Sequence, residues 1–380
     1  MTTTPTAGSR GDDEPAGTGD MARSVQEVAA DVNIAADDNG NRVDVGRHRR
    51  SWRESRRSRH SQAMRVLCCL LNWRTPDMTL QALDTLLVEV RAINARVPGS
   101  ARVAVVDNDS GDGSEAALVK GVADRGAADV VEVLQSGKNG GYGFGNNVAL
   151  RKAINDGDEV VYLLNSDAFV EGAALQTLLA HLEHNPQVGI AGGYIHGIDG
   201  EPHPGAFHYP TIWSEIEGSV RFGPLSKLLK DKVVPRPVPT TTVHDVDWVP
   251  GASMVIRTEV LKHIGLFDER FFLYYEETDL CHRATDAGWQ IAFVREASVA
   301  HIVGATTGVK NLKRRTPGYL LDSRRHYFLK HHGRAYLWAA NAVYAAGLAS
   351  FRLRRRLQGK PEQDYDRALQ DFVVHCVKHP

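Results

Sequence analysis

The sequence predicts an α/β fold in which helices cover a mostly parallel sheet, with a disordered tail before it and a helical extension after it. Apolar runs typical of buried strands alternate with stretches of helical periodicity between residues 64 and 294. Polar clusters follow four successive predicted strands. The chain has 380 residues, 42% of them hydrophobic, and is therefore long enough to bury a large core.

Residues 1–62 form the predicted disordered tail. Residues 1–41 contain eight acids and two arginines, and residues 42–59 contain eight arginines. Such a segment cannot bury enough apolar surface to offset the entropy lost on ordering. The arginine block either contacts an anionic membrane surface or RNA, or pairs in solution with the acidic half of the tail, and we favour the second reading. The net charge of −1 gives no reason to expect nucleic acid as a partner.

The first ordered half begins with an apolar strand, Arg65–Leu71, followed by a helix in which leucines recur at helical spacing up to Val90. Further strands are expected at residues 102–106, 130–134 and 160–164, with a glycine-rich loop at 137–145 and a helix from about Asn147.

The second half is expected to contain a long loop-rich stretch at 196–244, rich in proline, which we interpret as an acceptor-side insertion. Helices are expected at 175–182, 258–264 and 278–287, and strands at 188–191, 246–257, 290–294 and 297–300.

The C-terminal part contains an uncharged segment, residues 335–351, between arginines. We expect a helix there that lies on the catalytic domain or on the cytoplasmic membrane face. A basic run either faces a lipid-linked diphosphate or anionic lipid, or is a solvated surface; it comprises Lys310, Lys313, Arg314, Arg315, Arg324 and Arg325.

The polar clusters predict a ligand site at the carboxyl ends of the strands, where open α/β sheets bind their ligands. The clusters are Asn72, Asp107–Ser114, Asn139–Asn147 and Asn165–Asp167. The glycine-rich loop within the third cluster either brings its backbone close to a ligand or supplies ordinary turns.

Two groups of residues are candidates for metal binding and proton transfer. Asp167 ends a buried strand and suits a hard cation, with His301 as a second ligand, although a turn acid and a structural histidine are the alternatives. Glu276, Glu277 and Asp279 follow an aromatic run and are candidate general bases. The alternative is a helix N-terminus that favours acids, with Asp279 paired to Arg283.

Taken in order, these segments resemble family 2 glycosyltransferases, in particular the rhamnosyltransferase branch, over about residues 64–332. The matching motifs are Leu71-Asn72-Trp73-Arg74, Asp107 to Ser114, Asn139 to Asn147, Leu164 to Asp167, Gly265 through Gly288, and His301.

The resemblance implies a GT-A fold, a nucleotide-diphosphate sugar donor, an Mg²⁺ or Mn²⁺ ion and inversion at the anomeric carbon. It implies that Asp107 contacts the nucleotide base, that Asn72 and Asn147 line its pocket, and that Asp167 and His301 bind the metal. Asn139 and Ser166 are expected to contact the donor. Glu277 falls at the position of the general base, with Glu276 and Asp279 beside it. The sequence departs from the family's motifs at two positions. Glu277 replaces an aspartate, and Asn165 replaces the first acid of the metal motif.

We therefore expect a catalytic domain at residues 63–305, divided into a nucleotide-binding half (63–170) and an acceptor half (171–305), and a basic helical extension at 306–380. The leading hypothesis is transfer of L-rhamnose from dTDP-L-rhamnose to a polyprenyl-diphosphate-linked saccharide or a cell-wall or polysaccharide glycan. The alternatives are a soluble tailoring glycosyltransferase for a small natural product and an inactive sugar-nucleotide binding module. The four cysteines form no CxxC pair and no signal sequence is visible, so we expect a cytoplasmic location, including the inner face of the cell membrane.

Overall fold

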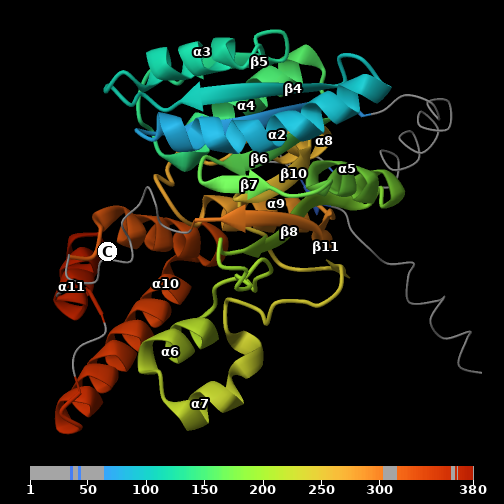
Figure 1. Ribbon diagram of the computed structural model, residues 1–380. Coiled ribbons are helices and arrows are strands. Elements are labelled where there is room, and N and C mark those ends of the chain that lie inside the picture. The colour runs from blue at the N-terminus through green and yellow to red at the C-terminus, as the bar shows by residue number, and fades with distance from the viewer. Residues whose placement is uncertain are drawn as a thin grey trace, which may run out of the picture. The chain divides into compact units, whose positions relative to one another are not determined.

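The computed structural model in Figure 1 describes residues 35–36, 42–43, 64–302, 315–360, 364–365 and 367–379. The chain divides into two compact units, Met1–Gln62 and Ala63–Pro380. In the first unit, β1 (Ala35–Ala36) pairs antiparallel with β2 (Arg42–Val43). The other residues of the predicted tail lie outside the described residues, as do Lys310, Lys313 and Arg314 of the predicted basic run.

A nine-stranded sheet forms the centre of the second unit, in the order β5-β4-β3-β6-β10-β8-β11-β7, with β9 paired to β11. The pairings make β3, β4, β5, β6, β8 and β11 run in one direction and β7, β9 and β10 in the other, which confirms a mostly parallel sheet. The strands are β3 (Val66–Asn72), β4 (Ala101–Asp107), β5 (Val131–Gln135), β6 (Val160–Asn165), β7 (Ala168–Val170), β8 (Val188–His196), β9 (Val243–His244), β10 (Ser253–Arg257) and β11 (Gln290–His301).

Helices cover both faces of the sheet (Figure 1) because the central strands are apolar on both sides. Along β3, Val66 and Cys68 belong to one core, and Leu67 and Cys69 to the other. The first core is completed by α2 (Pro76–Arg96), α3 (Ser114–Asp124) and α5 (Ala174–His184), and the second by α4 (Tyr142–Asp156), α8 (Thr258–Ile264) and α9 (Glu276–Asp286).

The segment predicted to be loop-rich contains α6 (Ile212–Val220), α7 (Gly223–Leu228) and the 3₁₀ helix η2 (Lys230–Lys232). A capping box starts α6, because the side chains of Thr211 and Ser214 each bond the backbone of the other. This helix packs closely on α10, where a Cβ at Gly347 would overlap the hydroxyl of Ser219. The prolines on both sides of α6 hid it in the sequence pattern.

The C-terminal extension forms α10 (Gly318–Leu357), kinked at Gly333 where φ is 79°, and α11 (Ala368–Lys378). The first part of α10 packs on the segment before α9 through Tyr327 and Phe328, which share a core with Phe271. No helix within the described ranges is both long and apolar enough to span a membrane.

The interpretation of Arg324 as part of a ligand-facing basic surface is wrong. Its side chain is only 9% exposed and forms an ion pair of 2.6 Å with Glu215 of α6, which is 10% exposed. Arg324 also donates to Asn341 on the far side of the kink at 2.7 Å. This arginine therefore ties α6 to both parts of α10. Arg315 in turn pairs with Asp371 of α11.

Replacement of one member of this ion pair should destabilise the protein more than replacement of both. Arg324→Met leaves the Glu215 carboxylate buried without its partner, which costs about 3 kcal/mol in the free energy of unfolding. The double variant Arg324→Met/Glu215→Met should recover most of that loss, since it leaves no buried charge. Urea unfolding at neutral pH measures both values. Equal losses in the single and double variants would show that the arginine stem, and not the ion pair, provides the stabilisation.

Candidate active site

The polar clusters after β3 and β4 lie side by side because these strands are parallel neighbours with Asn72 opposite Asp107. Both side chains are buried, and Asn72 Nδ2 donates to Asp107 Oδ1 at 2.7 Å. Thr79 fixes the other end of the amide by donating to Asn72 Oδ1 at 2.7 Å. Asp107 also accepts from the backbone and hydroxyl of Ser110 and from Gln135, so it orders the loop that follows β4.

The glycine-rich loop connects this cluster to residues 268–279, which we call the acidic segment. Asn139 Oδ1 accepts from Asn108 Nδ2 at 3.2 Å and from the Gly141 amide at 3.1 Å. Gly141 has φ of 93°, and a Cβ there would overlap the carbonyl oxygen of Phe272. That carbonyl accepts from the Tyr142 amide at 3.0 Å. Glycine is thus required for the loop to contact the segment before the acids.

Asn147 has a role that the sequence did not indicate. Its side chain is 1% exposed, and its amide exchanges two hydrogen bonds of 3.0 Å with the backbone of Phe267. It also donates to Glu269 at 3.0 Å. These contacts make Asn147 a clamp on the loop that leads to the acidic segment. Its predicted place in the lining of a nucleotide pocket stays a prediction.

Asp167 and His301, 134 positions apart, are brought together by β7 and β11. The strands pair antiparallel with His301 opposite Ala168, and the His301 Nε2 atom lies 3.0 Å from Asp167 Oδ1. The Asp167 carbonyl accepts from the amide of Ile302 at 3.0 Å. Ser166 is buried beside Asp167, at the turn after β6. The structure therefore creates the pair that the metal hypothesis requires.

The Asp167–His301 pair fits a divalent cation that keeps other ligands. A carboxylate oxygen and an imidazole nitrogen 3.0 Å apart are suitable donors for Mn²⁺, and the oxygen also suits Mg²⁺. Within the part of the chain that the structure describes, no third histidine, cysteine or acid clusters with them. Waters and ligand oxygens would therefore fill the remaining coordination positions.

The backbone before α9 is strained. Tyr274 and Tyr275 both adopt the left-handed region, with φ of 69° and 71°. Such a conformation costs a residue other than glycine about 1–3 kcal/mol. Tyr275 packs against Tyr327 of α10 with ring centroids 5.4 Å apart. This contact holds the turn that delivers Glu276 to the start of α9.

Glu276 and Glu277 are adjacent carboxyl groups, the first buried and the second half-buried. Glu276 is 1% exposed, and its Oε2 finds no hydrogen-bond partner among the described residues. Burial and the neighbouring charge of Glu277 raise the pKa of Glu276 well above its ordinary value. Burial also raises the pKa of Glu277. The pair therefore holds a proton at a higher pH than ordinary carboxyl groups, a property suited to acid–base chemistry.

The backbone of two residues, Gly251 and Ala252, connects Glu277 to the turn that carries Asp167. Its Oε1 accepts from the Gly251 amide at 3.2 Å, and the Gly251 carbonyl accepts from the Tyr142 hydroxyl at 3.0 Å. The next carbonyl, that of Ala252, accepts from the Asn165 amide at 3.2 Å. Asn165 begins the turn that carries Asp167, so the acid pair and the Asp167–His301 pair belong to one site.

Asp279 differs from its two neighbours. Its Oδ1 accepts from Lys330 at 2.6 Å and from His331 at 2.8 Å, and its Oδ2 accepts from Arg283 at 2.8 Å. Burial acts to raise the pKa of Asp279, but these partners outweigh it and lower the pKa to about 2. An ionised, fully bonded carboxylate is a poor proton acceptor. We therefore correct the assignment of Asp279 from candidate base to positioning residue.

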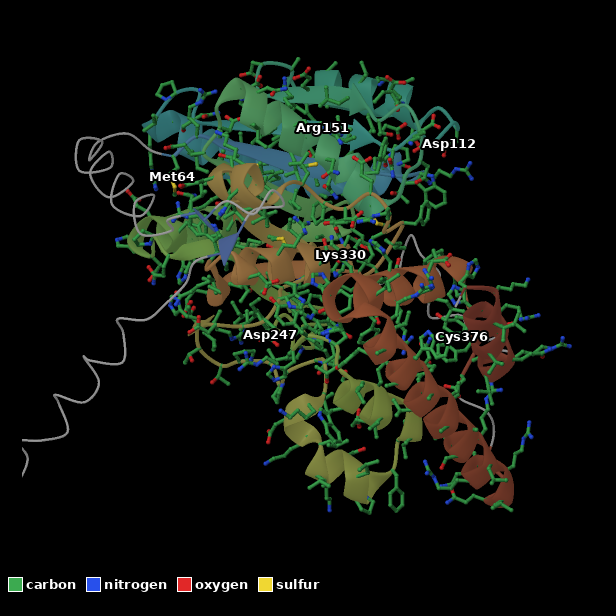
Figure 2. The ribbon with its side chains drawn as sticks, turned by 180° about the vertical axis from the view of Figure 1, so that it is seen from behind. Met64, Asp112, Arg151, Asp247, Lys330 and Cys376 are labelled. Carbon is green, nitrogen blue, oxygen red and sulfur yellow. The ribbon has the colours of Figure 1, made fainter. Side chains whose placement is uncertain are left out.

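Lys330 of α10, labelled in Figure 2, connects two carboxylates of the acidic segment. Besides Asp279 it contacts Asp268 at 2.9 Å, and His326 lies 3.0 Å from the same Asp268 oxygen. Sequence reasoning missed this clamp. The spacing of His326 and Lys330 marks one helix face, but nothing in the sequence links that face to Asp268.

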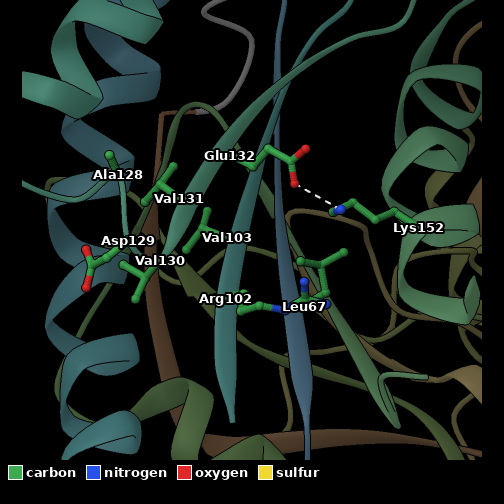
Figure 3. A pocket seen from close by; sticks show the side chains of 9 residues that line it. All are labelled: Leu67, Arg102, Val103, Ala128, Asp129, Val130, Val131, Glu132 and Lys152. Carbon is green, nitrogen blue, oxygen red and sulfur yellow. Dashed lines mark ion pairs between the residues drawn. The ribbon is translucent and has the colours of Figure 1, made fainter. Parts of the chain in front are cut away.

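A hollow at the opposite ends of the strands, shown in Figure 3, is a separate feature. Leu67 and Arg102 line it at the starts of β3 and β4, whereas Asn72 and Asp107 are at the ends of these strands. Its Glu132–Lys152 ion pair, 2.9 Å long, satisfies both charges. The hollow lacks Asp167, His301, the Glu276–Glu277 pair and the glycine-rich loop, so we do not assign the active site to it.

Comparisons with known proteins point to a single family. The sequence model described as "Glycosyltransferase like family 2" matches residues 78–319. The N-acetylglucosaminyl-diphospho-decaprenol L-rhamnosyltransferase of Mycobacterium tuberculosis is 28% identical over 223 residues, which cover 54% of this chain and 68% of that protein. The pre-mycofactocin glycosyltransferase of the same organism is 30% identical over 200 residues, 53% of this chain and 37% of that protein.

A solved structure shows the same fold. The mannosyltransferase PcManGT from Pyrobaculum calidifontis, determined in complex with GDP-Man and Mn²⁺, aligns with a TM-score of 0.50 at 13% identity. The alignment covers 83% of each chain. This similarity confirms the expected GT-A fold.

The raised pKa of Glu276 predicts a change in the pH dependence of stability. A carboxyl group whose pKa is raised by folding stabilises the protein below its unfolded pKa, and this stability is lost as pH rises through the folded pKa. Glu276→Gln removes this group, so its advantage in unfolding temperature over the wild type should increase as pH rises above about 4.5. Thermal unfolding between pH 4 and 8 tests this, and parallel pH profiles for the two proteins would contradict the burial of an ionisable Glu276.

Proposed function

The chain belongs to glycosyltransferase family 2, and on this basis we propose that it transfers a sugar from a nucleotide-diphosphate donor to an acceptor hydroxyl with inversion. The observation that carries the proposal is the half-buried Glu277 beside the buried Glu276, joined through Gly251 and Ala252 to the turn of Asp167. The reaction requires a proton acceptor and a cation site within one active site.

We assign the role of general base to Glu277. Its carboxylate takes the proton of the acceptor hydroxyl as the hydroxyl oxygen forms a bond to the anomeric carbon. The bond from that carbon to the diphosphate oxygen breaks on the opposite face, so a single displacement inverts the configuration. The raised pKa makes Glu277 a stronger base than an exposed carboxylate.

The donor would be held at the ends of the strands. We assign the nucleotide base to Asn72 and Asp107, whose mutual hydrogen bond fixes both side chains, and further donor contacts to Asn139 and Ser166. Asp167 and His301 would hold Mg²⁺ or Mn²⁺, which when bound offsets the negative charge of the departing diphosphate. The Mn²⁺ in the structurally similar mannosyltransferase supports a divalent ion.

For the donor sugar and acceptor we propose L-rhamnose, from dTDP-L-rhamnose, and a polyprenyl-diphosphate-linked saccharide of cell-wall or polysaccharide assembly. The L-rhamnosyltransferase relative, whose name gives an N-acetylglucosaminyl-diphospho-decaprenol acceptor, supports both. The alternative is a soluble enzyme that modifies a small natural product, and the pre-mycofactocin relative favours a different acceptor of this kind. An inactive binding module is disfavoured, because the candidate base, metal ligands and nucleotide contacts are all present.

An enzyme with a lipid-linked acceptor would act at the cytoplasmic face of a membrane. The end of α10 is suited to contact with that membrane surface. Leu353 is 60% exposed and Leu357 is 80% exposed, and three arginines of the last turn lie between them: Arg354, Arg355 and Arg356. Exposed leucines insert among acyl chains, and arginines favour anionic headgroups.

Loss of the proposed metal ligand or of the proposed base should greatly lower turnover. Asp167→Asn and Glu277→Gln should each lower metal-dependent nucleotide release at least 100-fold, about the contribution of a general base or an electrostatic contact. Release is measured against UDP-, GDP- and dTDP-sugars with Mn²⁺, Mg²⁺ or EDTA, with Glu183→Gln, an exposed acid in α5, as the matched control. Near-normal turnover in both variants would contradict the assignment, and silence of the wild type on all donors would favour the inactive module.

Vesicle sedimentation distinguishes the two acceptor classes. The wild-type protein should pellet with phosphatidylglycerol vesicles and remain in the supernatant with phosphatidylcholine vesicles. Leu353→Ser/Leu357→Ser should release it, whereas Val88→Ser, an equally exposed apolar position in α2, should not. Wild-type protein that stays in the supernatant with both vesicle types would support the tailoring enzyme.

A further inference from the structure

Three aromatic side chains form a cluster at the surface, two of them in the segment that leads to Glu276 and Glu277. The Phe272 and Tyr319 ring centroids are 5.7 Å apart, and the rings of Tyr274 and Tyr319 are stacked at 6.4 Å with an angle of 24° between their planes. Phe272 is 40% exposed, and Tyr274 and Tyr319 are half-buried. Rings that are large, apolar and in contact with solvent are typical of binding surfaces.

The backbone of the acidic segment divides its aromatic residues between the core and the surface. Phe271 is fully buried, and Tyr275 packs on Tyr327 of α10. Phe272 and Tyr274 belong to the surface cluster with Tyr319. The left-handed conformation of Tyr274 and Tyr275 makes this division possible. Core packing explains the inward residues, and a backbone hydrogen bond from Tyr274 to the Glu276 carboxyl group accompanies the left-handed turn.

The cluster is fixed relative to the proposed base. The Phe272 carbonyl accepts from the Tyr142 amide, while the Tyr142 hydroxyl and Glu277 bind the two polar groups of Gly251. On its other side, Ser323 of α10 donates to the Leu273 carbonyl at 3.1 Å. Tyr319 is one helical turn before Ser323, so α10 holds it against the same segment. The cluster and Glu277 are thus attached to one rigid frame.

We propose that Phe272, Tyr274 and Tyr319 form the acceptor subsite, on which the sugar ring that presents the attacking hydroxyl stacks with its face of C–H groups. This inference rests on the proposed function and names the acceptor class as a saccharide. Aromatic faces carry partial negative charge and attract the slightly positive C–H groups of a pyranose. Stacking there would place the ring next to Glu277 without using any of the donor contacts.

The test uses octyl β-N-acetylglucosaminide, a probe that carries both a sugar ring and an alkyl chain, with the full chain in saturation-transfer difference NMR. The ring C–H protons should receive the strongest saturation. Tyr319→Leu should weaken probe binding about tenfold, the loss of one aromatic stacking contact. Tyr319→Phe should preserve it, and so should Trp338→Leu, a 61% exposed aromatic position farther along α10.

Several results would overturn the proposal: equal binding by Tyr319→Leu and wild type, saturation confined to the octyl protons, or no binding by the wild type. Saturation of the octyl protons alone would assign the cluster to a lipid chain. A fall in the unfolding temperature of Tyr319→Leu that matches its loss of binding would assign Tyr319 to folding. Nucleotide release by the wild type, measured separately, decides the proposed function, so its failure is distinguishable from failure of this subsite.

Discussion

The ion pairs that Lys330 of α10 forms with two acids are the interaction on which the rest of the site depends. Its ammonium group contacts Asp268, which precedes the left-handed turn at Tyr274 and Tyr275, and Asp279, which follows it. Asp279 is also paired with Arg283 and His331, and Asp268 with His326, so Lys330 is the cation that both carboxylates share. The C-terminal extension thus joins the two sides of this turn through a side chain that remains only 23% exposed.

This arrangement separates two kinds of carboxylate within four residues. Asp279, surrounded by cations, stays ionised and anchors α9. Glu276, which is buried, and Glu277, which is half-buried, retain protons at higher pH. The difference does not arise from residue type but from which face of the first helical turn meets α10. The first turn of α9 therefore holds one carboxylate that anchors the helix and two carboxyl groups whose pKa values are raised.

Much of the sheet and half of the site were predictable. Parallel strands end at one edge, so the proximity of Asn72 and Asp107 followed from the apolar runs before them. The Asp167–His301 contact was indicated by motif order alone. The partners of Asp279 were not predictable, because His331 lies 52 positions away on a helix with no local signal toward it. The left-handed turn was hidden as well, since tyrosine rarely adopts it.

The pairing of Asn72 with Asp107 also bears on how faithfully the sheet assembles. Strands β3 and β4 are apolar on both faces, so a shift of two residues would keep every side chain on its own face and cost little in apolar burial. Such a shift would place Leu70 opposite Asp107 and leave a buried carboxylate without its amide donor, a penalty of about 1–3 kcal/mol. The Asn72–Asp107 pair thus rejects misaligned strands, so the two residues that we propose to hold the nucleotide base also favour a unique topology.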